Sequence, residues 1–115
     1  LQGKPLTIYG DGSQTRSFCY VDDLIDGMLS LMESNLNTPV NIGNPEEFKI
    51  IDLANLIKKI INPKLKFTFQ PLPEDDPLQR KPDITKAKNN LDWQPKINLD
   101  DGINKTIDWF RKKYF

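Results

Sequence analysis

Histidine is absent from the chain, and cysteine occurs once among its 115 residues. Without histidine, this chain alone has no imidazole general base, no Ser-His-Asp triad and no histidine-ligated zinc site. A single cysteine excludes an internal disulfide and a cysteine metal cluster, and it is compatible with a reducing compartment. Basic and acidic residues number 16 each, so the net charge is zero and a nucleic-acid-binding protein is disfavoured.

Long hydrophobic runs are also lacking, because no stretch of about 18 apolar residues occurs and a membrane-spanning segment is therefore not expected. Residues 1–5 lack both an initiator methionine and the apolar core of a signal peptide. We expect the chain to be a piece of a longer protein or a processed product. Its 37% hydrophobic and 28% charged residues are typical of a folded domain or part of one.

Short β-prone runs alternate with amphipathic helical patterns, which favours an α/β fold. Strands are expected at residues 7–9, 18–21, 40–43 and 66–69, and helices from about 22 to before 35, over 50–61, over 84–91, and from Asn98 onward. Asp22 or Asp23 is expected to cap the first helix, whose apolar stripe through Leu24, Met28 and Leu31 predicts a core-facing helix.

After the predicted strand at 66–69, the sequence indicates an extended loop and, near its end, a last helix. Three prolines within residues 71–77 predict an extended loop. Asn98, with Asp101 three residues later, predicts a capped helix start. The residues that recur at helical spacing predict its buried face: Ile103, Ile107, Phe110 and Tyr114.

The segment from Tyr9 to Arg16 is the first candidate for ligand binding. Gly10 and Gly12 flank an aspartate, which predicts a tight turn that brings backbone amides close to a ligand, and Arg16 can donate two hydrogen bonds to a phosphate. A plain hairpin turn with a surface arginine explains the same residues. The turn is not a dinucleotide-binding fingerprint, because Thr15 stands where a third glycine is needed.

The second candidate is the loop of residues 75–83, which contains Arg80 and Lys81 and is long enough to be functional or simply a charged connection. Its acidic residues lack a ligand pattern, so no metal site is expected. The Asp22-Asp23 pair is better explained as a helix cap than as a catalytic pair. Cys19 is better explained as a packed thiol than as a nucleophile, because no base accompanies it.

Four blocks of the chain, in their order, resemble the extended short-chain dehydrogenase/reductases that act on nucleotide sugars. They are residues 5–24 (PLTIYGDGSQTRSFCYVDDL), 39–45 (PVNIGNP), 74–84 (EDDPLQRKPDI) and 91–96 (LDWQPK). Together the blocks resemble one branch, UDP-glucuronate decarboxylase (UDP-xylose synthase). The first block is shared across several branches, whereas residues 79–83 after the acidic stretch are more particular to the decarboxylases. The resemblance implies the C-terminal, substrate-binding portion of that α/β fold over residues 1–115, with short strands, about four helices and the Rossmann half absent.

The resemblance implies a reaction as well. In this family bound NAD oxidises C4 of UDP-glucuronate, the 4-keto acid loses CO2, and the hydride returns to give UDP-xylose. The family's Tyr-x-x-x-Lys pair is missing here, because the residue four positions after Tyr9 is Ser13 and the residue four positions after Tyr20 is Leu24. The chain alone is therefore expected to be inactive and to hold no NAD-binding residue. The alternatives to a decarboxylase are a nucleotide-sugar 4-epimerase, a 4,6-dehydratase or a non-catalytic UDP-sugar-binding module.

By match to the family, Arg16 is expected on the diphosphate, Tyr9 and Gln14 near the uridine, and Arg80 near the reacting sugar acid, as a substrate-binding or catalytic residue. The implied partners are a UDP-sugar, the missing Rossmann domain and, in the full-length enzyme, a second copy as a homodimer. Nucleic acid and membrane are not expected partners, and a cytoplasmic location is expected.

Overall fold

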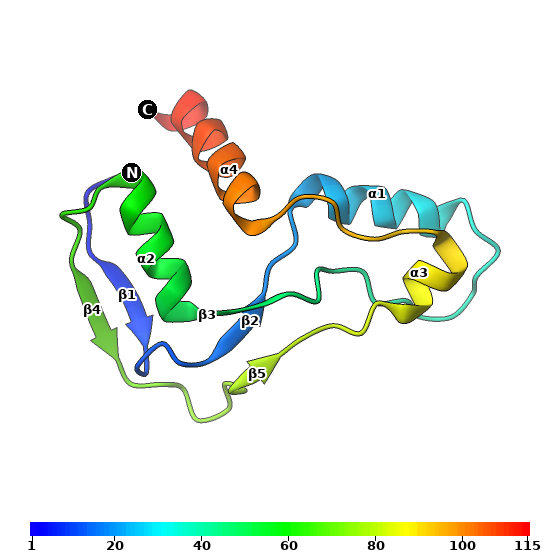
Figure 1. The fold of residues 1–115 in the computed structure, drawn as a ribbon, viewed down its shortest axis with the longest axis horizontal. Coiled ribbons are helices and arrows are strands. Elements are labelled where there is room, and N and C mark those ends of the chain that lie inside the picture. Colours follow the sequence, from blue (N-terminus) through cyan, green and yellow to red (C-terminus); the bar gives the residue numbers. More distant parts are fainter. The chain divides into compact units, whose positions relative to one another are not determined.

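The computed structural model describes all residues from Leu1 to Phe115 and confirms a mixed α/β architecture with four helices. The elements in chain order are β1 (Leu6–Tyr9), β2 (Thr15–Ser17), α1 (Val21–Met32), β3 (Glu47–Lys49), α2 (Ile50–Ile61), β4 (Phe67–Gln70), β5 (Gln79–Arg80), α3 (Thr85–Leu91) and α4 (Leu99–Tyr114) (Figure 1). No helix is both long and hydrophobic enough to cross a bilayer.

The chain forms two compact units that interleave in sequence. The strand unit comprises Leu1–Arg16, Glu47–Arg80 and Thr106–Phe115, and the α1 unit comprises Ser17–Glu46 and Lys81–Lys105. Helix α4 contributes its first turns to the α1 unit and its last turns to the strand unit.

A parallel pair of strands, β1 and β4, lies beside α2 in the strand unit (Figure 1). Ile8 of β1 is almost fully buried, and Thr7 and Thr68 face each other in register with their hydroxyls 3.3 Å apart. The buried apolar residues of this unit are Ile8, Ala54, Leu65 and Ile107. The strands predicted at residues 7–9 and 66–69, and the helix predicted over 50–61, are thereby confirmed.

A second, three-stranded sheet has the order β3-β2-β5, and β2 and β5 run parallel. The predicted strand at residues 18–21 is wrong, because the strand is β2, which ends at Ser17, and α1 already begins at Val21. The predicted strand at residues 40–43 is also wrong. Val40 and Ile42 are instead partly buried and pack against the core of the α1 unit without pairing as a strand.

The core of the α1 unit is built from Ile84, Ala87 and Trp93. Helix α1 comes close to this core at Gly27, where an added Cβ would lie 2.5 Å from Ile42 Cγ2 and 2.9 Å from Trp93 Cε2. Because a side chain at this position would collide with two neighbours, only glycine allows the close approach.

Asp23 has a different structural role from the one predicted. The N-cap position of α1 is Tyr20, and no side chain caps the helix. The Asp23 carboxylate instead accepts hydrogen bonds from the backbone amides of Lys96 (3.0 Å) and Ile97 (2.8 Å), and its carbonyl accepts one from the Trp93 indole (3.1 Å). Asp23 thus ties α1 to the segment that leads into α4.

Asn98 caps α4 as predicted. Its side-chain oxygen accepts the Asp101 amide at 2.9 Å, and its side-chain nitrogen donates to the Asp101 carboxylate at 2.9 Å. The predicted buried face of α4 is only partly right, because Ile107 is buried whereas Phe110 and Tyr114 are exposed.

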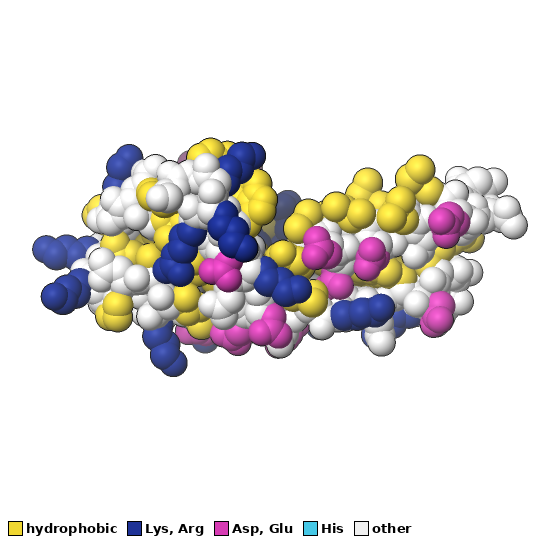
Figure 2. Space-filling view, turned by 90° about the horizontal axis from the view of Figure 1, so that it is seen from above, with side chains coloured by type: hydrophobic (Ala, Val, Ile, Leu, Met, Phe, Trp, Pro, Cys, Tyr) yellow, Lys and Arg dark blue, Asp and Glu magenta, His cyan; other side chains and the backbone are white.

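One face of α1 is apolar and exposed, which contradicts the predicted core-facing helix. The exposed residues of this face, spaced as on one side of a helix, are Val21, Ile25, Met28, Leu29 and Met32. Figure 2 shows hydrophobic side chains in a row over the α1 unit, interspersed with acidic ones. Leu24 and Leu31 are half-buried. A chain of this length buries too little surface to cover every apolar stripe that it carries.

We expect this chain, expressed alone, to self-associate through the exposed face of α1, because contiguous apolar surface in water drives association. Light scattering during size-exclusion chromatography measures the mass. Replacing Ile25 and Leu29 with lysine should shift the mass toward that of a monomer, whereas a control change of Asp26 to asparagine should not. A monodisperse, cooperatively melting monomer of the unchanged chain would contradict this expectation.

Candidate functional site

The candidate site begins at the turn between β1 and β2, where two glycines adopt left-handed backbone angles. Gly10 has φ of 65° and Gly12 has φ of 78°, a region that other residues rarely adopt. A Cβ on Gly12 would also lie 2.9 Å from the Cβ of Ile51. The glycine turn predicted at residues 10–13 is therefore present, and it lies directly against the start of α2.

The turn also caps α2. The Gln14 and Gly12 carbonyls accept the amides of Ile50 (3.0 Å) and Ile51 (2.9 Å), which are the first two residues of the helix. This explains why Lys49, at the N-cap position, is tolerated without a side-chain cap. The turn leads from β1 into β2 rather than into a helix, so it does not fit the pyrophosphate of NAD in the manner of a dinucleotide-binding loop.

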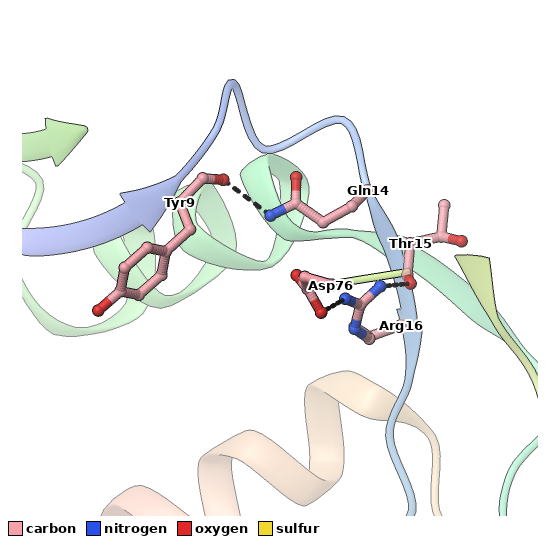
Figure 3. A network of polar contacts seen from close by, with 5 residues as sticks. All are labelled: Tyr9, Gln14, Thr15, Arg16 and Asp76. Atoms are coloured by element: carbon pink, nitrogen blue, oxygen red, sulfur yellow. Dashed lines mark hydrogen bonds and ion pairs between the residues drawn. The ribbon is translucent and has the colours of Figure 1, made fainter. Parts of the chain in front are cut away.

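Two sets of side-chain hydrogen bonds brace the turn, one at its exposed surface and one from the buried Gln14. The side chain and backbone of Ser13 hydrogen-bond to Asp11 and hold the pKa of its carboxyl below the usual value. Gln14 is 6% exposed, and its amide nitrogen donates to the Tyr9 carbonyl at 2.8 Å (Figure 3). Gln14, expected near the uridine, thus has a bracing role in this structure, while Tyr9 remains half exposed.

Arg16 is fixed by two partners at the edge of the strand unit. Its guanidinium donates to the Thr15 carbonyl at 2.7 Å and forms an ion pair with Asp76 of the loop between β4 and β5 (Figure 3). The Arg16 side chain is 17% exposed and that of Asp76 is 32% exposed. The Arg16 side chain is therefore mostly buried, with a small part of its surface exposed to solvent.

Glu47 of β3 contacts residues of both other strands of this sheet. One of its carboxylate oxygens accepts both the Thr15 hydroxyl at 2.9 Å and the Gln79 amide at 2.8 Å. These two hydrogen bonds join side chains of all three strands of the sheet, and they hold Thr15 and Gln79 beside each other in register. Sequence reasoning did not assign a role in the site to Glu47, Asp76 or Gln79. The acidic stretch that contains Asp76 was considered as a charged connection and as a metal site, but not as a partner of Arg16.

The register of β2 and β5 pairs Arg16 with Arg80. Neighbouring parallel strands lie about 4.8 Å apart, and residues paired in register project from the same face of a sheet. Two arginines predicted from separate sequence blocks therefore emerge side by side from one face. Two arginines at neighbouring backbone positions suit a ligand with several negative charges, because a guanidinium can donate two hydrogen bonds to a phosphate or carboxylate.

Two further sequence candidates lie in the α1 unit. Lys81 lines an open pocket of about 460 Å³ together with Lys88 and Lys96. Cys19 is half-buried, and burial, with a smaller contribution from the Asp23 charge, raises the pKa of its thiol. A raised pKa lowers the thiolate fraction, which supports a packed thiol rather than a nucleophile.

Comparison with known proteins places the chain in a family. The family model described as GDP-mannose 4,6 dehydratase matches residues 1–106. The chain belongs to this family. Within it, similar curated relatives are UDP-glucuronic acid decarboxylase 1 of Danio rerio, 51% identical over 113 residues, and UDP-glucuronic acid decarboxylase 4 of Arabidopsis thaliana, 49% identical over 115 residues. These alignments cover 98% and 100% of this chain but only 27% and 26% of the relatives.

Solved structures of UDP-sugar 4-epimerases support the same α/β fold. The UDP-glucose 4-epimerase of Thermotoga maritima, solved with UDP-glucose, matches with a TM-score of 0.92 at 33% identity, over 99% of this chain and 37% of that one. The UDP-glucuronic acid 4-epimerase of Bacillus cereus, solved with UDP-glucuronic acid and NAD, matches with a TM-score of 0.88 at 35% identity, over 98% and 37%. The predicted resemblance to the extended dehydrogenase/reductase fold is confirmed.

Proposed function

We propose that this chain supplies the UDP-sugar contacts of an NAD-dependent decarboxylase that converts UDP-glucuronate to UDP-xylose and CO2 through a 4-keto intermediate. The observation that carries the proposal is the pairing of Arg16 with Arg80 on adjacent strands. Two neighbouring arginines support this proposal, because a substrate with a diphosphate and a carboxylate calls for two cations. The decarboxylase names of relatives about half identical to the chain support the same substrate.

Each residue has a distinct part in this proposal. Arg16 binds the diphosphate and Tyr9 lies near the uridine. Gln14 holds the turn between these two residues, and Arg80 reaches the sugar acid. NAD supplies the hydride transfers when bound, and no residue of this chain is assigned to it. The chain then works as a nucleotide-sugar-binding domain over residues 1–115, beside a Rossmann domain in the remainder of the enzyme, which is proposed to be a cytoplasmic homodimer.

Replacing Arg16 with alanine in the complete enzyme should weaken UDP binding about 10- to 150-fold, because a charge-assisted hydrogen bond contributes about 1.5–3 kcal/mol. Isothermal titration calorimetry with UDP measures the change. Arg111, an exposed arginine on α4 that pairs only loosely with Asp108, provides the matched control, and its replacement with alanine should leave the affinity unchanged. An Arg16 variant with unchanged affinity would refute the proposed diphosphate contact.

A UDP-sugar 4-epimerase is the second candidate, because epimerases solved with UDP-sugars share the fold at 33–35% identity. Incubation of the complete enzyme with UDP-glucuronate distinguishes the two reactions. Release of CO2 together with a UDP-pentose supports the decarboxylase, and a UDP-hexuronate isomer without CO2 supports the epimerase. Binding of UDP-glucuronate without any product would indicate a non-catalytic binding module instead.

A further inference from the structure

Asp76 occupies one side of the guanidinium that the proposed function assigns to the substrate. Its carboxylate pairs with a terminal nitrogen of Arg16, and the other terminal nitrogen donates to the Thr15 carbonyl at 2.7 Å (Figure 3). Asp75, the preceding residue, is exposed and forms no ion pair with Arg16. Of two adjacent carboxylates on the same loop, only one therefore neutralises the arginine.

The two partners of Arg16 differ in how easily they can be replaced. The Thr15 carbonyl belongs to the backbone of β2, and the Thr15 side chain is itself fixed by a hydrogen bond to Glu47. Asp76 lies in the proline-rich loop between β4 and β5, and its side chain is 32% exposed, against 17% for Arg16. A solvated carboxylate on a loop can leave at small cost, because partly exposed ion pairs contribute little.

We propose that Asp76 is an internal counter-ion that holds the Arg16 guanidinium in place in the ligand-free protein and gives up this position to a phosphate of the incoming ligand. The inference rests on the proposed function of Arg16. A carboxylate and a phosphate oxygen can both accept the N–H groups of the terminal Arg16 nitrogen that faces Asp76, so the two compete for one position. Asp76 therefore lowers the affinity for a nucleoside diphosphate and makes binding selective for ligands able to displace a carboxylate.

The test is a set of variants of the complete enzyme titrated with UDP by calorimetry at low and at physiological salt. Asp76→Asn should tighten UDP binding about two- to fivefold at low salt, which is the scale of a partly exposed ion pair. Asp75→Asn removes the same charge from the same loop and should leave the affinity unchanged. In an Arg16→Ala background, Asp76→Asn should lose most of its effect, because the pair no longer exists. Asp76→Ala repeats the test without an amide that could hydrogen-bond.

Each outcome bears on one statement. Tighter binding by both Asp76 variants, with Asp75→Asn unchanged, supports the counter-ion role. Equal tightening by Asp75→Asn and Asp76→Asn would indicate a general charge effect and overturn it. Unchanged or weaker binding by the Asp76 variants, while Arg16→Ala still weakens binding, overturns this inference and leaves the proposed function intact. Unchanged binding by Arg16→Ala overturns both.

Discussion

Replacing Arg80 with methionine in the complete enzyme is expected to lower the turnover of UDP-glucuronate about 100-fold, whereas UDP affinity should fall less than about 10-fold. The structure places Arg80 on β5, in register with Arg16 on β2. If Arg16 binds the diphosphate, the neighbouring guanidinium remains for the part of the ligand that UDP lacks, the sugar acid. A cation aimed at the reacting sugar stabilises charge as it develops, so its loss affects turnover more than binding.

Lys81 provides the control for this prediction, because it is the next residue and also carries a positive charge. Lys81 belongs to the α1 unit and lines the pocket that also contains Lys88 and Lys96, so Lys81→Met should leave turnover within about threefold of the unchanged enzyme. Steady-state kinetics with UDP-glucuronate and calorimetry with UDP give the two required values. Normal turnover in the Arg80 variant would exclude Arg80 from catalysis, and an equal loss of turnover and UDP affinity would make it a binding residue only.

Local chemistry made much of the fold predictable from sequence. The glycine turn after Tyr9 and the cap at Asn98 were predicted from residues that restrict their own backbone or satisfy it nearby. The helix over 50–61 was predicted from apolar residues at helical spacing. The wrong strands at 18–21 and 40–43 have a physical reason as well. An apolar run signals burial, and Val40 and Ile42 achieve burial without a strand partner.

The candidate site was predictable only in part. The resemblance assigned Arg16 and Arg80 to the substrate, but their juxtaposition depends on β5, a two-residue strand defined by its register with β2. The partners of the site are distant in sequence, since Asp76 lies 60 residues from Arg16 and Glu47 lies 32 residues from Thr15. Spacing patterns report on neighbours along one helix or strand, so they carry no information about such pairs.

Replacing Asp23 with alanine is expected to lower the free energy of unfolding by about 2–3 kcal/mol, because it leaves partly buried backbone amides without an acceptor. Asp23 is 4% exposed, and a single oxygen of its carboxylate accepts the backbone amides of both Lys96 and Ile97. An asparagine oxygen can occupy the same position without the charge, so Asp23→Asn should cost only about 1 kcal/mol.

Asp22 is the matched control for Asp23, since it is the preceding acidic residue in the first turn of α1 and is exposed. Asp22→Ala should cost at most about 0.5 kcal/mol, which is the scale of a surface charge near a helix N-terminus. Urea unfolding of the complete protein, followed by circular dichroism, measures all three variants. If Asp22→Ala and Asp23→Ala cost the same, both residues act only on the helix dipole, and the segment before α4 is held in place by the packing of Trp93 rather than by the Asp23 carboxylate.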